Sequence, residues 1–224
     1  DVWHDDPANL LVGGPAANSA VAYSALAGPC AVAGPIGNDA FGDFLVSALE
    51  RRGITCIAGR VASTATHTIA LGADGRRQAY YYPGEHIDLG DLAIHWPGGH
   101  LYLTALSLTV DRPIVPGILA VAAVARAGGG RTVLDIGQAG PEMLNFEELC
   151  QLGDAVDVII GNAYEFELVL GAPYQEARGR FREGFHGDVI VKLGRDGALV
   201  DPGLDEDLIP VAGFPVDEIN PIGA

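Results

Sequence analysis

Lysine is almost absent from this sequence. Of the 13 basic residues only Lys192 is a lysine, and 29 acidic residues leave a formal net charge of −16. Because nucleic acids and anionic membranes are bound by dense clusters of positive charge, we expect neither as a partner. The same acidity would repel a polyphosphate, so any nucleotide site must rely on backbone N–H groups, a few arginines and a divalent cation.

Cysteine and long apolar runs are also scarce. The three cysteines, Cys30, Cys56 and Cys150, are far apart and in no CxxC spacing, which argues against a disulfide framework and a zinc site. No apolar run approaches the length of a membrane span, and the first six residues lack the basic segment of a secretory signal. We therefore expect a protein of the reducing cytoplasm that is not anchored in a membrane.

What the sequence does contain is apolar residues in alternating helix and strand patterns. They make up 49% of the 224 residues, enough for the core of one α/β domain. Helices alternating with short buried strands indicate a parallel sheet covered on both faces. The predicted helices are 16–27, 39–53, 113–127, one from about 163 and 175–183, and the predicted strands are 31–33, 100–103, 132–136, 156–160 and 189–193.

One segment departs from this alternation. Between Thr66 and Tyr82, two runs rich in β-branched and aromatic residues flank the glycine-bounded turn Gly72–Gly75. This pattern predicts a β-hairpin that projects from the main sheet as a flap.

Two glycine-containing stretches near the start could carry chemistry. Gly13 and Gly14 would let a backbone pass close to a ligand, and Asn18 on the following helix could bind a hydroxylated substrate. The alternative is a tight turn with a polar helix start. The second stretch is 37–42, in which Asp39 is interpreted as a helix N-cap and Gly42 as a glycine needed for close packing.

Two further stretches lie where strands end, the edge at which open α/β sheets bind ligands. Asn162 and Glu165 follow the apolar strand 156–160, and Glu165 is a candidate for the second shell of a metal ion. An acid placed against the helix dipole is the alternative. The next strand contains Lys192 near its end and is followed by Gly194 and Gly197. These glycines would admit a nucleotide, and the alternative is an ordinary strand-turn-strand unit.

In this order and spacing the motifs resemble the ribokinase-like, PfkB-type carbohydrate kinase family, over essentially all 224 residues. The first family signature is similar to Gly13 through Gly42, and the family's Asn-x-x-Glu motif is similar to Asn162 and Glu165. The glycine turn on the nucleotide side resembles Gly194 to Gly197. The second signature resembles Asn220 to Ala224, without its final Gly-Asp.

The resemblance implies a Rossmann-like three-layer α/β/α sandwich with a mostly parallel sheet and a small β-strand lid. The chain would form a single domain over 1–224, incomplete at its C-terminus, with lid elements within 1–15 and 62–84. The resemblance also implies that the sugar is bound by Asp1, Gly13, Gly14 and Asn18, and the nucleotide by Asn162, Lys192, Gly194 and Gly197. Glu165 would hold Mg²⁺ through water, and an anion hole would start at Gly223 and Ala224.

The implied function is transfer of the γ-phosphoryl group of ATP to a hydroxyl of a sugar or sugar acid, with ATP and Mg²⁺ as cofactors. A homodimer formed through the lid is one expected assembly. A nucleoside kinase of the same family and a non-catalytic sugar-binding domain are the alternatives. The family's catalytic aspartate would fall two residues past Ala224. We therefore expect the 224 residues to bind ligands but to phosphorylate slowly, since a general base contributes roughly 10²- to 10⁴-fold. We also expect poor stability.

Overall fold

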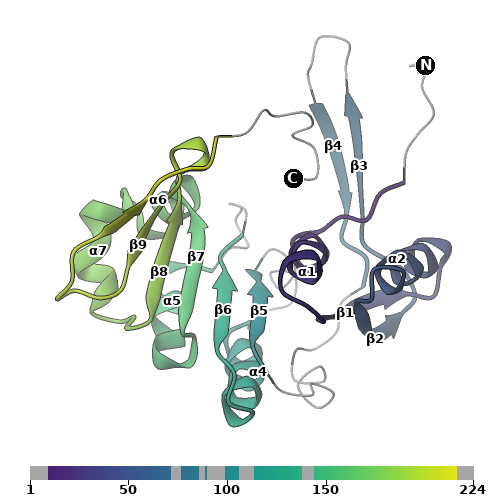
Figure 1. Cartoon of the computed structure of the whole chain (residues 1–224), viewed down its shortest axis with the longest axis horizontal. Coiled ribbons are helices and arrows are strands. Elements are labelled where there is room, and N and C mark those ends of the chain that lie inside the picture. Colours follow the sequence, from purple (N-terminus) through teal and green to yellow (C-terminus); the bar gives the residue numbers. More distant parts are fainter. Residues whose placement is uncertain are drawn as a thin grey trace. The chain divides into compact units, whose positions relative to one another are not determined.

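The computed structural model describes residues 10–71, 77–85, 89, 99–105, 114–137 and 144–215. The described chain divides into two compact units, the first ending at Glu85 and the second beginning with Leu89. Figure 1 labels most of the helices and strands of both.

The first unit is built on a parallel strand pair joined by a helix. Helix α1 (Pro15–Leu26) precedes strand β1 (Ala31–Gly37), helix α2 (Ala40–Glu50) and strand β2 (Thr55–Val61). The two strands pair in parallel from Ala31 opposite Thr55 to Gly37 opposite Val61. The sequence predicted β1 and both helices but not β2, because Gly59 and Arg60 interrupt its apolar pattern.

The predicted β-hairpin is confirmed. Strands β3 (Thr66–Leu71) and β4 (Arg77–Tyr82) pair in antiparallel fashion and form a two-stranded sheet of their own. The turn between them lies outside the described residues. Tyr80, Tyr81 and Tyr82 are all at least half exposed, and because strand side chains alternate, Tyr81 lies on the opposite face from Tyr80 and Tyr82.

Asp39 joins the start of α2 to the segment that leads into the hairpin. Its Oδ1 accepts hydrogen bonds from the Gly42 N–H at 2.7 Å and the Thr64 hydroxyl at 2.7 Å, and its Oδ2 accepts from the Thr64 N–H at 2.8 Å. The predicted N-cap is therefore confirmed, as is the close packing of Gly42. A Cβ on Gly42 would lie 2.1 Å from the carbonyl oxygen of Gly37.

We predict that Asp39→Asn lowers stability at neutral pH and that this effect disappears in acid. Hydrogen bonds from the Thr64 and Gly42 N–H groups and the Thr64 hydroxyl hold the pKa of Asp39 below its ordinary value of 3.8. A lowered folded-state pKa stabilises the fold above the unfolded-state pKa, and this contribution is lost as the pH falls through the folded-state value. Thermal unfolding of both proteins from pH 7 to pH 2 tests this. A difference in midpoint that is constant with pH would contradict it.

The second unit contains a six-stranded sheet in the order β10-β9-β8-β7-β6-β5 (Figure 1). The strands from β5 to β8 are parallel, and β9 and β10 are antiparallel to their neighbours. The strands are β5 (Leu101–Thr104), β6 (Thr132–Asp135), β7 (Val158–Asn162), β8 (Asp188–Lys192), β9 (Ala198–Asp201) and β10 (Ile209–Val211).

The helices that the structure describes in this unit cover one face of the sheet. Strands β5 to β8 follow one another in space as in sequence, and right-handed crossovers then put every connecting helix on the same side. Among the described residues, buried side chains of four helices, such as Phe166 and Phe181, form one core with alternate strand residues such as Leu134. The helices are α4 (Val115–Ala127), α5 (Phe146–Leu152), α6 (Ala163–Leu170) and α7 (Tyr174–Arg182), and the 3-10 turns are η2 (Gly153–Ala155) and η3 (Gly194–Asp196).

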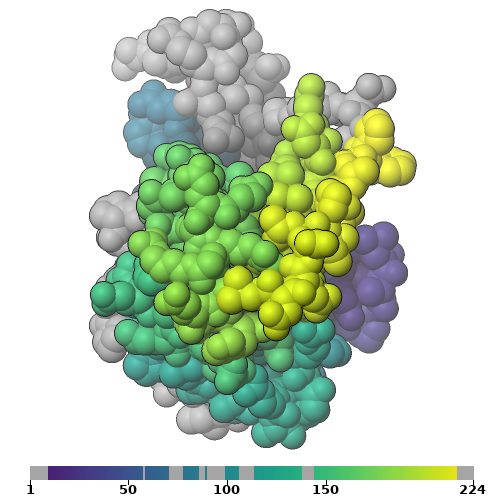
Figure 2. Space-filling model, turned by 90° about the vertical axis from the view of Figure 1, so that its left-hand side faces the viewer, coloured from purple at the N-terminus to yellow at the C-terminus, as the bar shows by residue number. Residues whose placement is uncertain are grey.

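A buried carboxylate fastens α7 to β9. Asp201 is 1% exposed and accepts hydrogen bonds from the Tyr174 hydroxyl at 2.5 Å, Arg178 Nε at 2.8 Å and Arg182 Nε at 3.1 Å. Arg178 also donates to the carbonyl of Gly203, in the β9–β10 connection. Figure 2 shows this yellow C-terminal segment beside the green helices of the same unit.

Candidate functional site

The carboxyl ends of the parallel strands bring together the polar residues of the second unit. Thr104 at the end of β5 lies opposite Asp135 at the end of β6, and Asn162 at the end of β7 lies opposite Lys192 at the end of β8. Their neighbours on the helix side, such as Leu134 and Val191, are buried. The side chains of Asp135, Asn162 and Lys192 therefore belong to the other face, at the edge where α/β sheets bind ligands.

Asn162 and Glu165 form a capping box at the start of α6. The Asn162 side chain accepts a hydrogen bond from the Glu165 N–H at 2.8 Å, and Glu165 Oε2 accepts from the Asn162 N–H at 2.7 Å. This geometry shows that both side chains stabilise the helix start. Burial raises the pKa of Glu165, opposed by the hydrogen bond from Asn162 and by the charge of Lys192.

The same motif occurs a second time. Asn145 and Glu148 cap α5 with distances of 3.0 and 2.9 Å. Asn145 is exposed, however, and Glu148 only partly buried, whereas Glu165 is 6% exposed and lies within electrostatic range of Lys192 and Asp135. The Asn-x-x-Glu spacing by itself thus specifies a capped helix. Burial and charged neighbours at the carboxyl edge distinguish the motif of Asn162 and Glu165 as a candidate site.

Lys192 is anchored by Asp135. Its Nζ lies 3.3 Å from Asp135 Oδ2, which also accepts a hydrogen bond from the Tyr102 hydroxyl at 2.8 Å. Asp135 Oδ1 accepts from the Gly137 N–H at 3.1 Å. The sequence pattern alone does not decide whether Asp135, in the predicted strand 132–136, faces a cleft or only supports the strand. It gave no reason to select Tyr102, whose alternation within β5 is the one signal that could have done so.

The glycine turn after β8 contains two different glycines. Gly194 has φ +61° and nothing within 4 Å of the place a Cβ would occupy, so the space beside it is open. Gly197 has φ +95°, and its Cβ would lie 2.0 Å from the carbonyl oxygen of Val211. The fold therefore requires Gly197 for packing against β10, and Gly194 leaves room for a ligand to approach the backbone.

The donor set at this edge suits a hard divalent cation that also binds a ligand. In the described part of the chain, no three His, Cys, Asp or Glu side chains are grouped to hold a metal by themselves. Asp135 and Glu165 supply carboxylate oxygens, and Mg²⁺ is commonly held by one or two carboxylates together with phosphates and water. Because Glu165 Oε2 already caps α6, the residues fit a cation held through water.

The predicted substrate residues lie in the first unit. Gly14 is the N-cap of α1 with φ +92°, which glycine adopts without strain. Gly13 and Gly14 are exposed, and a Cβ added at either would meet nothing within 4 Å, so packing does not account for Gly13. The Asn18 N–H donates to the Gly14 carbonyl at 3.0 Å, a bond that uses only the backbone of Asn18. The predicted roles of Asp1, Gly223 and Ala224 fall outside the described residues.

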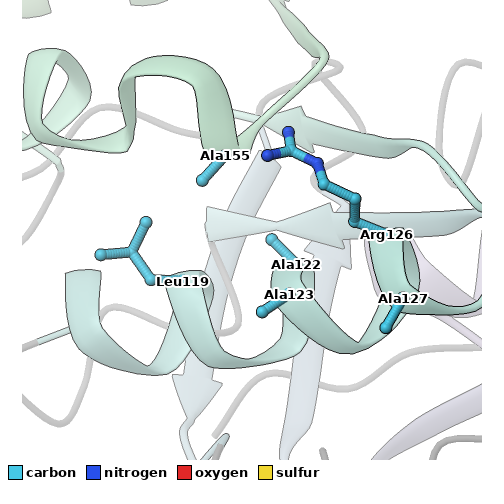
Figure 3. Close-up of a pocket in the computed structure, with 6 residues that line it drawn as sticks. All are labelled: Leu119, Ala122, Ala123, Arg126, Ala127 and Ala155. Carbon is cyan, nitrogen blue, oxygen red and sulfur yellow. The ribbon is translucent and has the colours of Figure 1, made fainter.

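Two hollows of the second unit lie away from this edge. One, of about 360 Å³, lies against α4 and η2 and is lined by alanines, Leu119 and Arg126 (Figure 3). The other, of about 290 Å³, lies where the strands begin, beside Asp154, Asp157 and Asp188. The first offers almost no polar partners for a hydroxylated ligand, and the second has three acids of which two pair with its own Arg131 and His186.

Comparison with protein families gives one match along nearly the whole chain: residues 8–224 match the model for the pfkB family carbohydrate kinases. The chain belongs to this family. The fold class predicted from the sequence, a ribokinase-like α/β fold with a mostly parallel sheet, is confirmed. Of the helices in the described regions, none has the length and apolar character needed to cross a bilayer.

Solved structures of related kinases share the fold. The aminoimidazole riboside kinase from Salmonella enterica is 25% identical, with a TM-score of 0.74 over 94% of this chain and 72% of its own. The fructokinase from Vibrio cholerae O395 is 23% identical, with a TM-score of 0.75 over 91% of this chain and 73% of its own. Fructokinase-2 from Oryza sativa subsp. japonica is 35% identical over 80 residues, 34% of this chain and 24% of that relative.

Proposed function

We propose that this pfkB-family protein transfers the γ-phosphoryl group of ATP to a hydroxyl of a sugar or sugar acid. The observation that carries the proposal is the cluster of Asn162, Glu165, Lys192 and Asp135 at the carboxyl edge of the sheet, next to the open turn at Gly194. A lone ammonium, a pair of carboxylates and exposed backbone are the groups a nucleotide with a divalent cation requires.

The chain's own residues position the reactants. Lys192 provides positive charge for the phosphates, and Gly194 and Gly197 shape the turn along which the nucleotide lies. A bound divalent cation, which we propose to be Mg²⁺ held through water by Glu165, would neutralise charge on the phosphates. Gly13, Gly14, Asn18 and Asp1 would bind the sugar, and backbone N–H groups from Gly223 and Ala224 would stabilise the transferring group.

A nucleoside kinase is the second candidate. The hairpin exposes Tyr80, Tyr81 and Tyr82, any of which could stack on a base. The related aminoimidazole riboside kinase from Salmonella enterica has been solved with that riboside and an ATP analogue. We also propose that the hairpin acts as a lid, that a homodimer forms through this lid, and that the protein acts in the cytoplasm.

An assay of ADP formation tests the proposed activity. The chain would be incubated with ATP, a divalent cation and one of ribose, fructose, ketodeoxygluconate, tagatose or adenosine. We expect slow ADP release that depends on both the acceptor and the cation. Release with adenosine alone would favour the nucleoside kinase. Thermal stabilisation by a sugar without any ADP release would favour the non-catalytic sugar-binding domain and contradict the kinase.

Glu165→Gln separates a metal role from a purely structural one. Glutamine can still accept the hydrogen bond from the Asn162 N–H, so the capping box persists. Because burial raises the pKa of Glu165 above its ordinary 4.5, the charged form is disfavoured in the fold, and its loss should leave the midpoint of unfolding at pH 7 unchanged or higher. We expect activity to fall about 10- to 100-fold.

Glu148→Gln is the matched control, because Glu148 forms the same capping box at the start of α5 and lies outside the cluster that we propose to bind the cation. It should leave activity unchanged. Equal activity of the Glu165 and Glu148 variants would show that Glu165 only caps its helix.

A further inference from the structure

The chain's one lysine is held in place by a carboxylate on a nearby strand of the same sheet. Lys192 Nζ reaches from β8 across β7 to Asp135 Oδ2 at the end of β6, a distance of 3.3 Å. The side chain of Lys192 is 42% exposed and that of Asp135 13%. Within the described residues, the ammonium donates one hydrogen bond to Asp135. Its other two N–H donors remain for solvent or a ligand.

Asp135 does not depend on Lys192 for its own position. The Tyr102 hydroxyl donates to its Oδ2 at 2.8 Å and the Gly137 N–H to its Oδ1 at 3.1 Å. A carboxylate can accept about four hydrogen bonds, so all three donors are accommodated. When the ammonium turns toward a ligand, the other two bonds keep the carboxylate in place.

We propose that Asp135 is a positioning residue that holds the Lys192 ammonium at the carboxyl edge of the sheet, ready to bind the phosphates of a nucleoside triphosphate. The inference rests on the proposed function, because that function places the nucleotide at this edge. A lysine side chain has many rotamers, and restricting them before the ligand arrives removes part of the entropic cost of binding. Tyr102 contributes by fixing the carboxylate.

A competing effect has the opposite sign. The negative charge of Asp135 repels phosphate and attracts the ammonium away from it, so a carboxylate that merely competes would weaken nucleotide binding. Replacing Asp135 by asparagine distinguishes these effects, since asparagine keeps the size and the acceptor oxygen but removes the charge. Positioning predicts weaker binding of ATP in the variant, and competition predicts tighter binding.

The experiment measures dissociation constants by calorimetry for ATP, ADP and adenosine, each with a divalent cation. For Asp135→Asn we expect about three- to tenfold weaker ATP binding, from the ordering of one long side chain. Adenosine, which lacks phosphates, should bind as it does to the unaltered chain. In a Lys192→Ala background, Asp135→Asn should cause no further loss, since no ammonium remains to be positioned.

Two variants serve as checks. Asp188→Asn removes a carboxylate that pairs with Arg131 at the opposite edge of the sheet, and it should not change ATP binding. Tyr102→Phe should weaken ATP binding in the same direction by a smaller factor, and it supports the inference independently if Asp135→Asn melts early.

Each outcome has a definite meaning. ATP binding to Asp135→Asn that is equal or tighter overturns the inference alone, as does an equal loss with and without Lys192. An unaltered chain that binds no ATP overturns the proposed function and the inference with it.

Discussion

Replacing Asp201 by asparagine is expected to lower the free energy of unfolding by about 3–5 kcal/mol. Although burial alone would raise the pKa of Asp201, hydrogen bonds from Arg178, Arg182 and Tyr174 hold it well below its usual range, so the carboxylate is charged in the fold. Arg182 is 3% exposed. The variant would leave its guanidinium buried without a compensating charge, the situation in which loss of one partner is most costly.

Chemical denaturation of the two proteins at pH 7 measures this difference. Asp188→Asn provides the comparison, because Asp188 also pairs with an arginine, Arg131, at 3.2 Å, with both side chains exposed by about half. An exposed pair contributes roughly 0–1 kcal/mol. Similar losses in the two variants would show that the buried network adds no more than a surface ion pair.

Gly197→Ala is expected to lower the free energy of unfolding by about 3 kcal/mol and to weaken nucleotide binding. Two costs combine: a φ of +95° strains alanine by about 1–3 kcal/mol, and the added Cβ overlaps the Val211 carbonyl, with overpacking costing about 1–3 kcal/mol. The overlap would push β10 away from the turn, which shifts the backbone along which we place the nucleotide.

Two neighbouring glycines separate these costs. Gly194 has φ +61° with open space around it, so Gly194→Ala should cost about 1–2 kcal/mol from backbone conformation alone. Gly203 has neither a positive φ nor a neighbour within 4 Å, and its alanine variant should be close to neutral. The losses in unfolding free energy should increase in the order Gly203, Gly194, Gly197. Equal stability of the Gly194 and Gly197 variants would contradict the packing argument.

The elements with strong periodicity could be predicted from the sequence. The strands β6, β7 and β8 and the helix α6 were located to within a few residues, because short apolar runs and capping residues mark them locally. Strand β2 and helix α5 were missed. The first contains Gly59 and Arg60, and the second is only seven residues long, too short for its period to stand out.

The candidate site was partly predictable for a related reason. Asn162 and Lys192 end their strands and Glu165 follows one, and the carboxyl ends of parallel strands meet at one edge. Contacts between elements distant in sequence could not be predicted, because no local pattern encodes them. The Tyr102–Asp135–Lys192 chain and the pairing of Arg182 with Asp201 are of this kind. The lid role of the hairpin stays a prediction.

The scarcity of lysine gives the site a chemical handle. These 224 residues contain one side-chain amine, and it is the amine held by Asp135. A mild acylating reagent would therefore add at most one side-chain label, and mass spectrometry could follow Lys192 in the unmodified sequence without engineering. A nucleotide bound at the site would then protect that single amine from acylation. This protection could be measured in a mixture of candidate ligands.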